Sequence, residues 1–233
     1  MPSKNSIKVY VDDSYYHIYN RGVEKRIIFQ DEQDYKVFLS YLKEYLSPVK
    51  NHNDLITIVT LQGQSFKAVK RQPKNYHLKV NLLAYCLMPN HYHLLIHQKD
   101  KQLIEKFMRS LSTRYSQYFN KKYKRVGPLF QGRYKAVLVK NEEYLLHLSR
   151  YIHLNPSEHT DDIIEAFSSY GEYLGKRKTS WISTQLILGL FENNRSAETL
   201  KIKSYQKFTE GSDNSYSSLP DNIFLDEDND GKD

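Results

Sequence analysis

The sequence predicts an α+β protein with a ferredoxin-like, split βαβ core, in which an antiparallel sheet carries helices on one face. The main reason is the order of the predicted elements, which runs strand, helix, strand, strand, helix, strand, helix. The second reason is size. A chain of 233 residues with 39% hydrophobic content can form one core of about 100–150 residues and a smaller appendage.

The first strand and the first helix are predicted in the N-terminal part of the chain. Residues 15–21, YYHIYNR, alternate in the manner of a strand. Over residues 31–46 the apolar positions recur at spacings of three and four after acidic residues, which is typical of a helix. The stretch of about 48–80 is interpreted as an insertion that contains a small hairpin turning near Gly63.

The remaining core elements follow in the next part of the chain. Residues 80–97 contain two apolar runs separated by Pro89-Asn90, which predicts a hairpin in the centre of the sheet. Residues 101–121 have helical spacing, and residues 133–139 read as the fourth strand. Asn141 suits the N-cap of a third helix. This helix is additional to the split βαβ core, so it is free to cross the sheet.

These elements divide the chain into three predicted parts. Residues 1–160 form the core domain, and residues 161–209 form a helical extension, with helices expected at 163–174 and 180–209. Residues 210–233 are rich in Ser, Asn and Asp and are expected to be disordered. Since no apolar run has the roughly 18–20 residues that span a bilayer, and the N-terminus lacks a secretory signal, a cytoplasmic protein without a membrane partner is expected.

Charge is distributed unevenly along the chain. The formal net charge is +7, but residues 101–140 contain eleven Lys or Arg and one acid, whereas residues 211–233 contain seven acids and one Lys. Aromatic residues are interleaved with the bases, so cations for phosphates lie beside rings on which unpaired bases can stack. A solvated helix face with core aromatics is the alternative. The candidate DNA-binding residues are Arg114, Lys121, Lys122, Lys124, Arg125, Arg133 and Lys135.

Two histidines form a candidate half of a metal site. His91 and His93 are separated by one residue in a predicted strand, so both imidazoles point to the same face. His97 has the same parity and suggests a competing zinc site with three histidines. However, it lies roughly 13–20 Å farther along the strand, which is too far to share one ion.

The third predicted helix contributes two further polar groups. Tyr151 and Asn155 are four residues apart, so a hydroxyl and an amide oxygen share one face of that helix. Each has an ordinary explanation as well. Tyr151 is one of twenty tyrosines and can simply pack against the sheet, and Asn155 precedes Pro156 and can end the helix.

Four sequence blocks resemble a known family when they are taken in order. They resemble the HUH superfamily of single-tyrosine transposases, which includes the REP-associated tyrosine transposases and is named for a histidine, hydrophobic residue, histidine motif. The resemblance extends from about residue 15 to 175. The blocks are YHIYNRG at 16–22, YCLMPNHYHLL at 85–95, GPLFQGRYKA at 127–136 and RYIHLNP at 150–156.

The resemblance implies a role for each candidate residue. It implies that His91, His93 and Asn155 bind Mg²⁺ or Mn²⁺, which neutralises charge on a phosphodiester. It implies that Tyr151 is the nucleophile, which forms a 5′-phosphotyrosine link and frees a 3′-hydroxyl, so that the reverse attack joins strands. The implied substrate is single-stranded or hairpin DNA, and the family includes homodimers and monomers. No general base is evident, and His153 and Lys135 are the candidates.

Two rival functions remain open at this point. One is a DNA-binding regulator that keeps the fold without catalysis and binds hairpin DNA without nicking it. The other is a zinc hydrolase or structural zinc protein, in which His17 or His147 completes a site with His91 and His93. The zinc reading predicts stoichiometric zinc and no covalent DNA adduct.

Overall fold

The computed structural model describes residues 9–49, 51–69, 74–191 and 198–211. Apart from its first two residues, the acidic C-terminal segment that was expected to be disordered lies outside the described residues. None of the helices in the described ranges combines the length and the apolar character needed to cross a bilayer.

The centre of the structure is an antiparallel sheet of four strands in the order β4-β5-β1-β6. Its strands are β1 (Ser14–Arg21), β4 (Val80–Met88), β5 (His91–Gln98) and β6 (Lys135–Val139). The strands β1 and β4 are joined by a helix and flank β5, which is the split βαβ arrangement. The predicted fold class, an α+β protein with a ferredoxin-like core, is confirmed.

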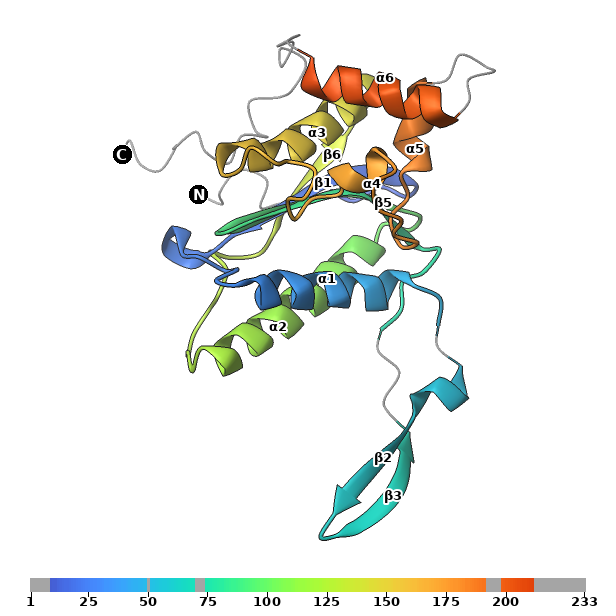
Figure 1. The fold of residues 1–233 in the computed structure, drawn as a ribbon. Coiled ribbons are helices and arrows are strands. Elements are labelled where there is room, and N and C mark those ends of the chain that lie inside the picture. Colours follow the sequence, from blue (N-terminus) through green and yellow to red (C-terminus); the bar gives the residue numbers. More distant parts are fainter. Residues whose placement is uncertain (1–8, 50, 70–73, 192–197, 212–233) are drawn as a thin grey trace.

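Helices cover both faces of this sheet (Figure 1). One face carries α1 (Glu32–Leu46) and α2 (Leu103–Lys122), and the other carries α3 (Glu142–Leu154). From the sequence, helices were expected on one face, and only the third helix was left free to cross the sheet. Every residue of β5 is buried, which is the property of a strand covered on both faces, and such strands read as continuous apolar runs.

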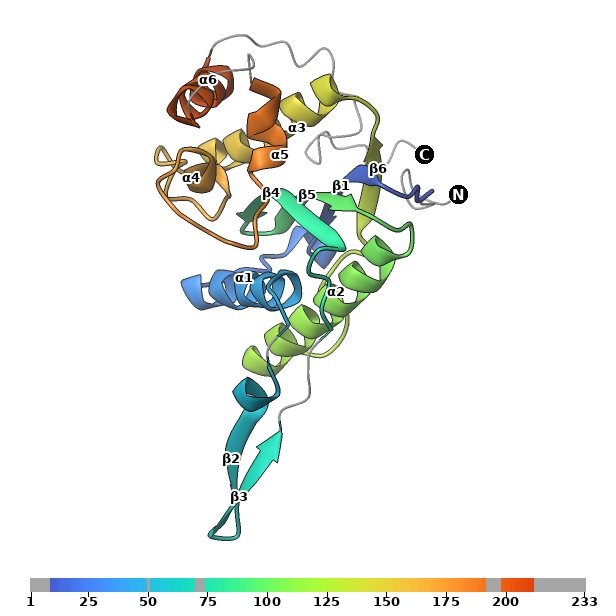
Figure 2. The same cartoon turned by 90° about the vertical axis from the view of Figure 1, so that its right-hand side faces the viewer.

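The insertion forms a separate two-stranded ribbon of β2 (Ile56–Leu61) and β3 (Gln64–Val69), preceded by a short 3-10 helix, His52–Leu55. Gln62 and Gly63 have positive φ angles of 50° and 80°, which suit a tight hairpin turn. The ribbon points away from the body of the protein (Figure 2).

The extension after the core contains less helix than predicted. Its helices are α4 (Tyr170–Tyr173), α5 (Gln185–Leu188) and α6 (Glu198–Glu210), and short 3-10 helices lie at Asn155–Glu158 and Gly189–Phe191. Residues 163–169 are not helical, because this segment pairs with the outer edge of β4. The amide of Leu87 donates to the carbonyl of Phe167 at 2.9 Å. The exposed edge of the sheet is thereby covered.

Candidate active site

Strand β5 places the two histidines on the face of the sheet that α3 covers. His91 is 4% exposed and His93 is fully buried. Their ring centroids are 5.0 Å apart and the rings are nearly perpendicular. Tyr92 points to the opposite face and packs against Phe38 of α1. Strand alternation therefore presents both imidazoles to the same space, as the sequence analysis expected.

Helix α3 brings the tyrosine and the asparagine to these histidines. It begins at the cap residue Asn141, whose side chain accepts a hydrogen bond from the amide of Tyr144 at 2.7 Å. The Tyr151 ring lies 5.4 Å from the His93 ring, measured between centroids. At the end of the helix, Asn155 Oδ1 lies 3.3 Å from His91 Nε2. The four candidate residues are therefore gathered from two elements of the same chain.

The hydrogen bonds of His91 determine which of its nitrogens can bind a cation. Its Nδ1 lies 2.6 Å from Asn90 Oδ1, and because an amide oxygen only accepts, Nδ1 carries the proton. In the neutral form of this tautomer, the lone pair of the ring is on Nε2, which faces Asn155 Oδ1. Two acceptors that face each other across 3.3 Å are arranged to share a cation.

His93 is held in a matching orientation by His17 of β1. His93 Nδ1 and His17 Nε2 are 2.9 Å apart, and the two rings stack. His93 Nε2 is buried without a hydrogen-bond partner among the described residues. A ring whose Nδ1 proton is donated to a neighbour and whose Nε2 is left free is the usual state of a metal-binding histidine. His17 was considered only as a zinc ligand from the sequence, so this supporting position was missed.

The electrostatics of the site favour neutral imidazoles. Burial lowers the pKa of His17 to about 3. Burial, together with the neighbouring His91 and His17, also lowers the pKa of His93. Rings that remain neutral at pH 7 keep the lone pairs that a divalent cation needs.

The donor set fits a cation bound by two imidazole nitrogens and one amide oxygen. Among the described residues there is no group of three His, Cys, Asp or Glu that could hold a metal ion. A site of mixed nitrogen and oxygen donors suits Mn²⁺, and also Mg²⁺ when further oxygen ligands complete the site.

The other histidines considered from the sequence point elsewhere. His97 Nε2 is 2.8 Å from Asp13 Oδ1 at the far end of the strand. The His147 ring packs 5.4 Å from the Phe208 ring of the C-terminal extension. His153 is fully buried between Tyr205 and Ser169, with separations of 2.6 Å and 2.8 Å. His153 is therefore occupied on the side of α3 that faces the extension, which disfavours it as a general base.

Lys135 lies on the same face of the sheet as the histidines. Tyr19 of β1 is directly opposite His93 on one side and Lys135 of β6 on the other. Side chains that are directly opposite on neighbouring strands share a face. Burial lowers the pKa of Lys135. Of the two candidate bases, Lys135 and His153, it is Lys135 whose side chain shares a face of the sheet with His93 and lies in register with it.

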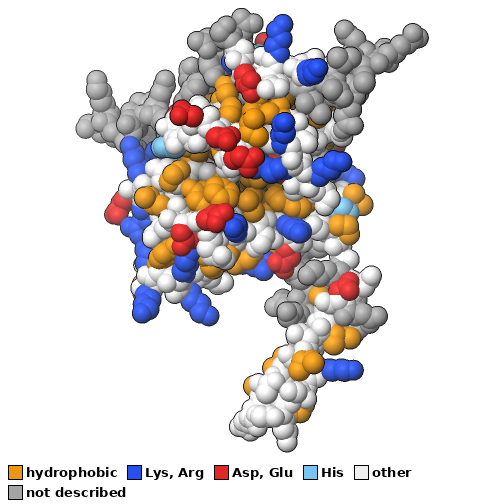
Figure 3. All heavy atoms as spheres, in the orientation of Figure 1, with side chains coloured by type: hydrophobic (Ala, Val, Ile, Leu, Met, Phe, Trp, Pro, Cys, Tyr) orange, Lys and Arg blue, Asp and Glu red, His pale blue; other side chains and the backbone are white. Residues whose placement is uncertain are grey.

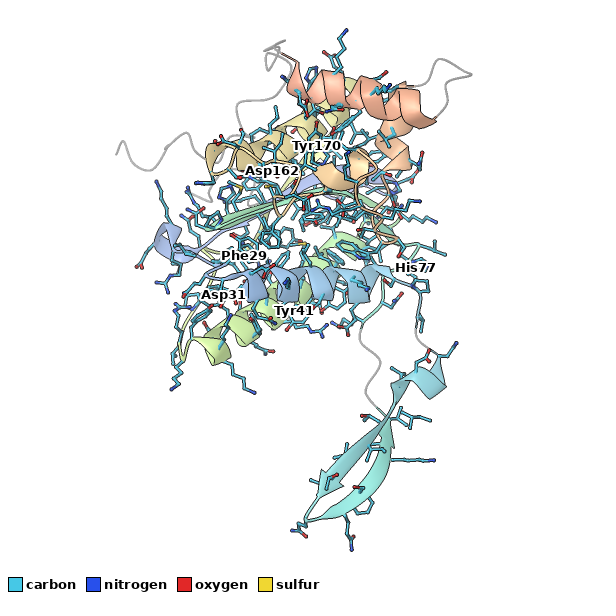
Figure 4. The ribbon with its side chains drawn as sticks, viewed as in Figure 1. Phe29, Asp31, Tyr41, His77, Asp162 and Tyr170 are labelled. Carbon is cyan, nitrogen blue, oxygen red and sulfur yellow. The ribbon has the colours of Figure 1, made fainter. Side chains whose placement is uncertain are left out.

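Two of the candidate DNA-binding residues make ion pairs within the protein. Arg114 pairs with Glu44 at 2.7 Å. Lys122 contacts Asp31 at 2.7 Å and the fully buried Asp34 at 2.8 Å. Both interactions join α2 to the region of α1, where Figure 4 labels Asp31. These two side chains therefore stabilise the packing of the helices, a role that composition alone did not indicate.

The other candidate bases lie nearer the end of α2 and beyond it. Arg125 Nη1 donates to Asn120 Oδ1 at 2.9 Å. Lys121, Lys124 and Arg133 are exposed. In Figure 3, Lys and Arg side chains stand out at the lower left of the body, where α2 ends in Figure 1. Lys121 and Lys124 are thus at the C-terminal end of α2, whereas Arg133 lines a hollow with Glu105 and Arg109 from the first half of the helix.

The chain was compared with protein families, with curated proteins and with solved structures, and it is similar to one family of transposases over part of its length. No curated protein matches the chain. A solved structure of a REP-associated tyrosine transposase bound to a REP hairpin aligns with a TM-score of 0.49 and 12% identity, over 77% of this chain and 97% of that one. The family model described as "Transposase IS200 like" matches residues 62–155, which is less than half of the chain but includes all four residues of the candidate site. Over these residues the chain is similar to IS200-like transposases, which agrees with the resemblance to single-tyrosine transposases.

Proposed function

We propose that this protein is a metal-dependent endonuclease and strand transferase that cuts single-stranded DNA with Tyr151. The observation that carries the proposal is the buried cluster in which Tyr151 contacts His93 while Asn155 faces His91. A nucleophile beside a cation-binding set is what phosphodiester chemistry requires, because the anionic phosphate repels nucleophiles until its charge is neutralised.

Three side chains would hold the cation. They are His91 and His93 through Nε2 and Asn155 through Oδ1. When bound, a divalent ion neutralises charge on a non-bridging oxygen of the scissile phosphate. Asn90 contacts Nδ1 of His91, and His17 contacts Nδ1 of His93. These contacts would hold the two imidazole ligands in place before the substrate binds.

Tyr151 performs the covalent step. Its phenolic oxygen forms a bond to phosphorus while the bond from phosphorus to the 3′ oxygen breaks. The phenolic proton leaves, and the departing 3′ oxygen takes up a proton to become a hydroxyl. The products are a 5′-phosphotyrosine link and a free 3′ end. Since the number of phosphoester bonds is unchanged, attack by another 3′-hydroxyl reverses the step and joins strands without a nucleotide cofactor.

Proton transfer is assigned to the region of Lys135. A phenol has a pKa of about 10, so its ionisation must be assisted at neutral pH. The cation of Lys135 would stabilise the phenolate, and the lowered pKa of this amine makes proton exchange easier. The four proposed residues lie together within one chain, so catalysis is proposed to need no residue from a second copy.

The proposal is tested with labelled single-stranded hairpin DNA from the flanks of the gene, incubated with Mg²⁺ or Mn²⁺ and resolved on a denaturing gel. The protein should give a metal-dependent nick with a protein-linked 5′ end. Tyr151→Phe and His91→Ala should abolish both products. The matched control is Tyr144→Phe on the same helix, because the buried hydroxyl of Tyr144 has no hydrogen-bond partner among the described residues.

Binding without a nick across all flanking sequences and both metals would overturn the proposal. The protein would then be a hairpin-binding regulator, and Tyr151 would be a packing residue. Stoichiometric zinc after purification, without any DNA adduct, would favour the zinc protein instead.

A further inference from the structure

The projecting ribbon of β2 and β3 exposes apolar side chains that its own two strands do not cover. Among the described residues, these two strands pair only with each other. Side chains alternate between the two faces of the ribbon, and both faces carry exposed apolar residues, which are Ile56, Ile58, Val59, Leu61, Phe66 and Val69. Hydrophobic side chains are visible along the ribbon in Figure 3. A two-stranded ribbon alone is marginally stable in water, and exposed apolar surface of this kind marks an interaction site.

The two edges of the ribbon differ in their side chains. Strand β2 has the sequence ITIVTL, which contains no charged residue, Pro or Gly. Strand β3 has the sequence QSFKAV and carries the exposed Lys67 near its middle. Lysine on an edge strand is one of the devices by which proteins prevent further strand pairing, and β2 lacks it. The outer edge of β2 is therefore open to another strand, whereas the outer edge of β3 is protected.

We propose that β2 pairs with β2 of a second copy of this chain, so that two ribbons form one sheet in the order β3-β2-β2-β3. Two identical antiparallel strands satisfy a two-fold axis, because each strand makes the same contacts as its partner. Short uncharged segments of high β-propensity are the kind that pair with an identical segment. A second copy fits this edge better than an acidic or a basic protein, because β2 offers no charge that such a partner could recognise.

The same arrangement explains why the pairing would stop at two copies. Both outer edges of the joint sheet are β3 strands, and each of them carries Lys67. A third ribbon would have to pair along an edge that this lysine protects. The interface is therefore closed and isologous, which is the form that gives a dimer and not a filament.

The size of the ribbon sets the strength of this dimer. Each of its strands has six residues, whereas a standard interface uses about 20–30 residues from each partner. The expected dimer is therefore reversible, with a dissociation constant of about 10 µM. The ribbon lies on the side of the body opposite α3 (Figure 1), so the contact leaves both candidate active sites open. The inference does not depend on the proposed function.

Sedimentation velocity over about 1–100 µM protein, without DNA or added metal, measures the association. The unmodified protein should shift from the mass of one chain to that of two. Ile58→Glu should raise the dissociation constant at least about tenfold, because it places like charges where the two β2 strands meet. Within the ribbon Ile58 is directly opposite Lys67, so the introduced carboxylate faces a cation and the ribbon itself is preserved.

Gln64→Glu is the matched control, because it adds the same charge to the same ribbon on β3. It should leave the dissociation constant unchanged. Thr60→Glu is a second test variant, since it puts a charge on β2 at an exposed position without removing an apolar side chain. It should weaken the dimer as Ile58→Glu does, and it keeps the test decisive if Ile58→Glu lowers the melting temperature.

Hydrogen exchange measured by mass spectrometry locates the contact. Peptides that contain β2 should exchange more slowly at the highest protein concentration than at the lowest. Peptides from β6, the last strand of the main sheet, should exchange equally at both concentrations. This comparison separates pairing of the ribbons from pairing of the main sheets.

Three results would overturn the proposal. The first is a protein that stays monomeric at every concentration. The second is a dimer that neither β2 variant weakens, or one that slows exchange in β6, because the contact would then lie on another surface. The third is slower exchange in β2 only when hairpin DNA is added, which would assign the ribbon to DNA. Failure of the nuclease proposal is recognised separately, because association is measured without DNA or cleavage.

Discussion

Replacing Tyr205 with Phe tests whether the C-terminal extension holds the catalytic helix in place. The Tyr205 hydroxyl on α6 accepts from His153 Nδ1 at 2.6 Å and donates to Ser149 Oγ at 3.0 Å. All three residues are fully buried, and the two partners belong to α3, which also carries Tyr151. The extension is therefore bonded to the helix that presents the nucleophile.

The expected cost follows from these two hydrogen bonds. Each buried hydrogen bond contributes about 1 kcal/mol, and a buried donor left without a partner costs about 1–3 kcal/mol. Tyr205→Phe should therefore lower the free energy of unfolding by about 2–3 kcal/mol. For a chain of this size, about 2–3 kcal/mol corresponds to a fall in melting temperature of roughly 4–12 °C.

Urea unfolding followed by circular dichroism measures this change. Tyr170→Phe is the matched control on the same extension, because its hydroxyl makes one part-buried hydrogen bond, to Glu210 Oε1 at 2.7 Å; its cost should be about 1 kcal/mol. Figure 4 shows Tyr170 on the α3 side of the sheet. A loss below about 0.5 kcal/mol for Tyr205→Phe would refute the reasoning, because surface substitutions alone cause changes of that order.

Two further predictions concern the metal ligands and the helix packing. His17→Phe should weaken Mn²⁺ binding about 10–100-fold in isothermal titration calorimetry, because His93 loses the partner that orients it. The control His97→Phe, at the far end of the strand, should leave the affinity unchanged. Equal Mn²⁺ affinities of the His17→Phe and the unmodified protein would contradict the supporting role of His17. Lys122→Met should destabilise the protein by about 2 kcal/mol at pH 7, because it leaves the buried Asp34 carboxylate without its cation. Burial alone would raise the pKa of Asp34, but its hydrogen bonds, of which that from Lys122 is the largest contribution, lower it. A carboxyl with a lowered pKa stabilises the fold fully above its unfolded pKa of about 3.9 and loses this contribution as pH falls through the folded pKa. In denaturation measured across pH, the stability difference between the two proteins should therefore begin to narrow below about pH 4 and should disappear once the pH is below the folded pKa. A difference that stays constant as the pH falls below about 4 would contradict the ion pair.

The local parts of the fold could be predicted from the sequence. Strand alternation fixed the common face of His91 and His93, and helical spacing fixed that of Tyr151 and Asn155. Both patterns depend only on backbone geometry, so they need no knowledge of neighbours. The order of the elements then limited the sheet to few topologies, and the ferredoxin-like arrangement was among them.

The contacts between distant segments could not be predicted in this way. Lys122 is a candidate DNA-binding cation in the sequence, and no local pattern indicates its contact with Asp34, which is 88 residues away. His17 is 76 residues from His93, which it supports. Residues 163–169 were predicted to be helical from their spacing alone. That spacing contains no information about the open edge of β4, with which the segment pairs. Each of these depends on tertiary packing, which a single sequence does not encode in any local pattern.

Locating the covalent DNA adduct by mass spectrometry tests the central claim most directly. The protein would be incubated with suicide hairpin DNA and Mn²⁺, the DNA trimmed with nuclease and the protein digested with trypsin. Cleavage after Arg150 and Lys176 isolates a peptide with three tyrosines, at 151, 170 and 173. A 5′-phosphonucleotide on Tyr151 is predicted. An adduct on Tyr170, Tyr173 or any tyrosine outside this peptide, or nicked DNA with no adduct, would contradict the account.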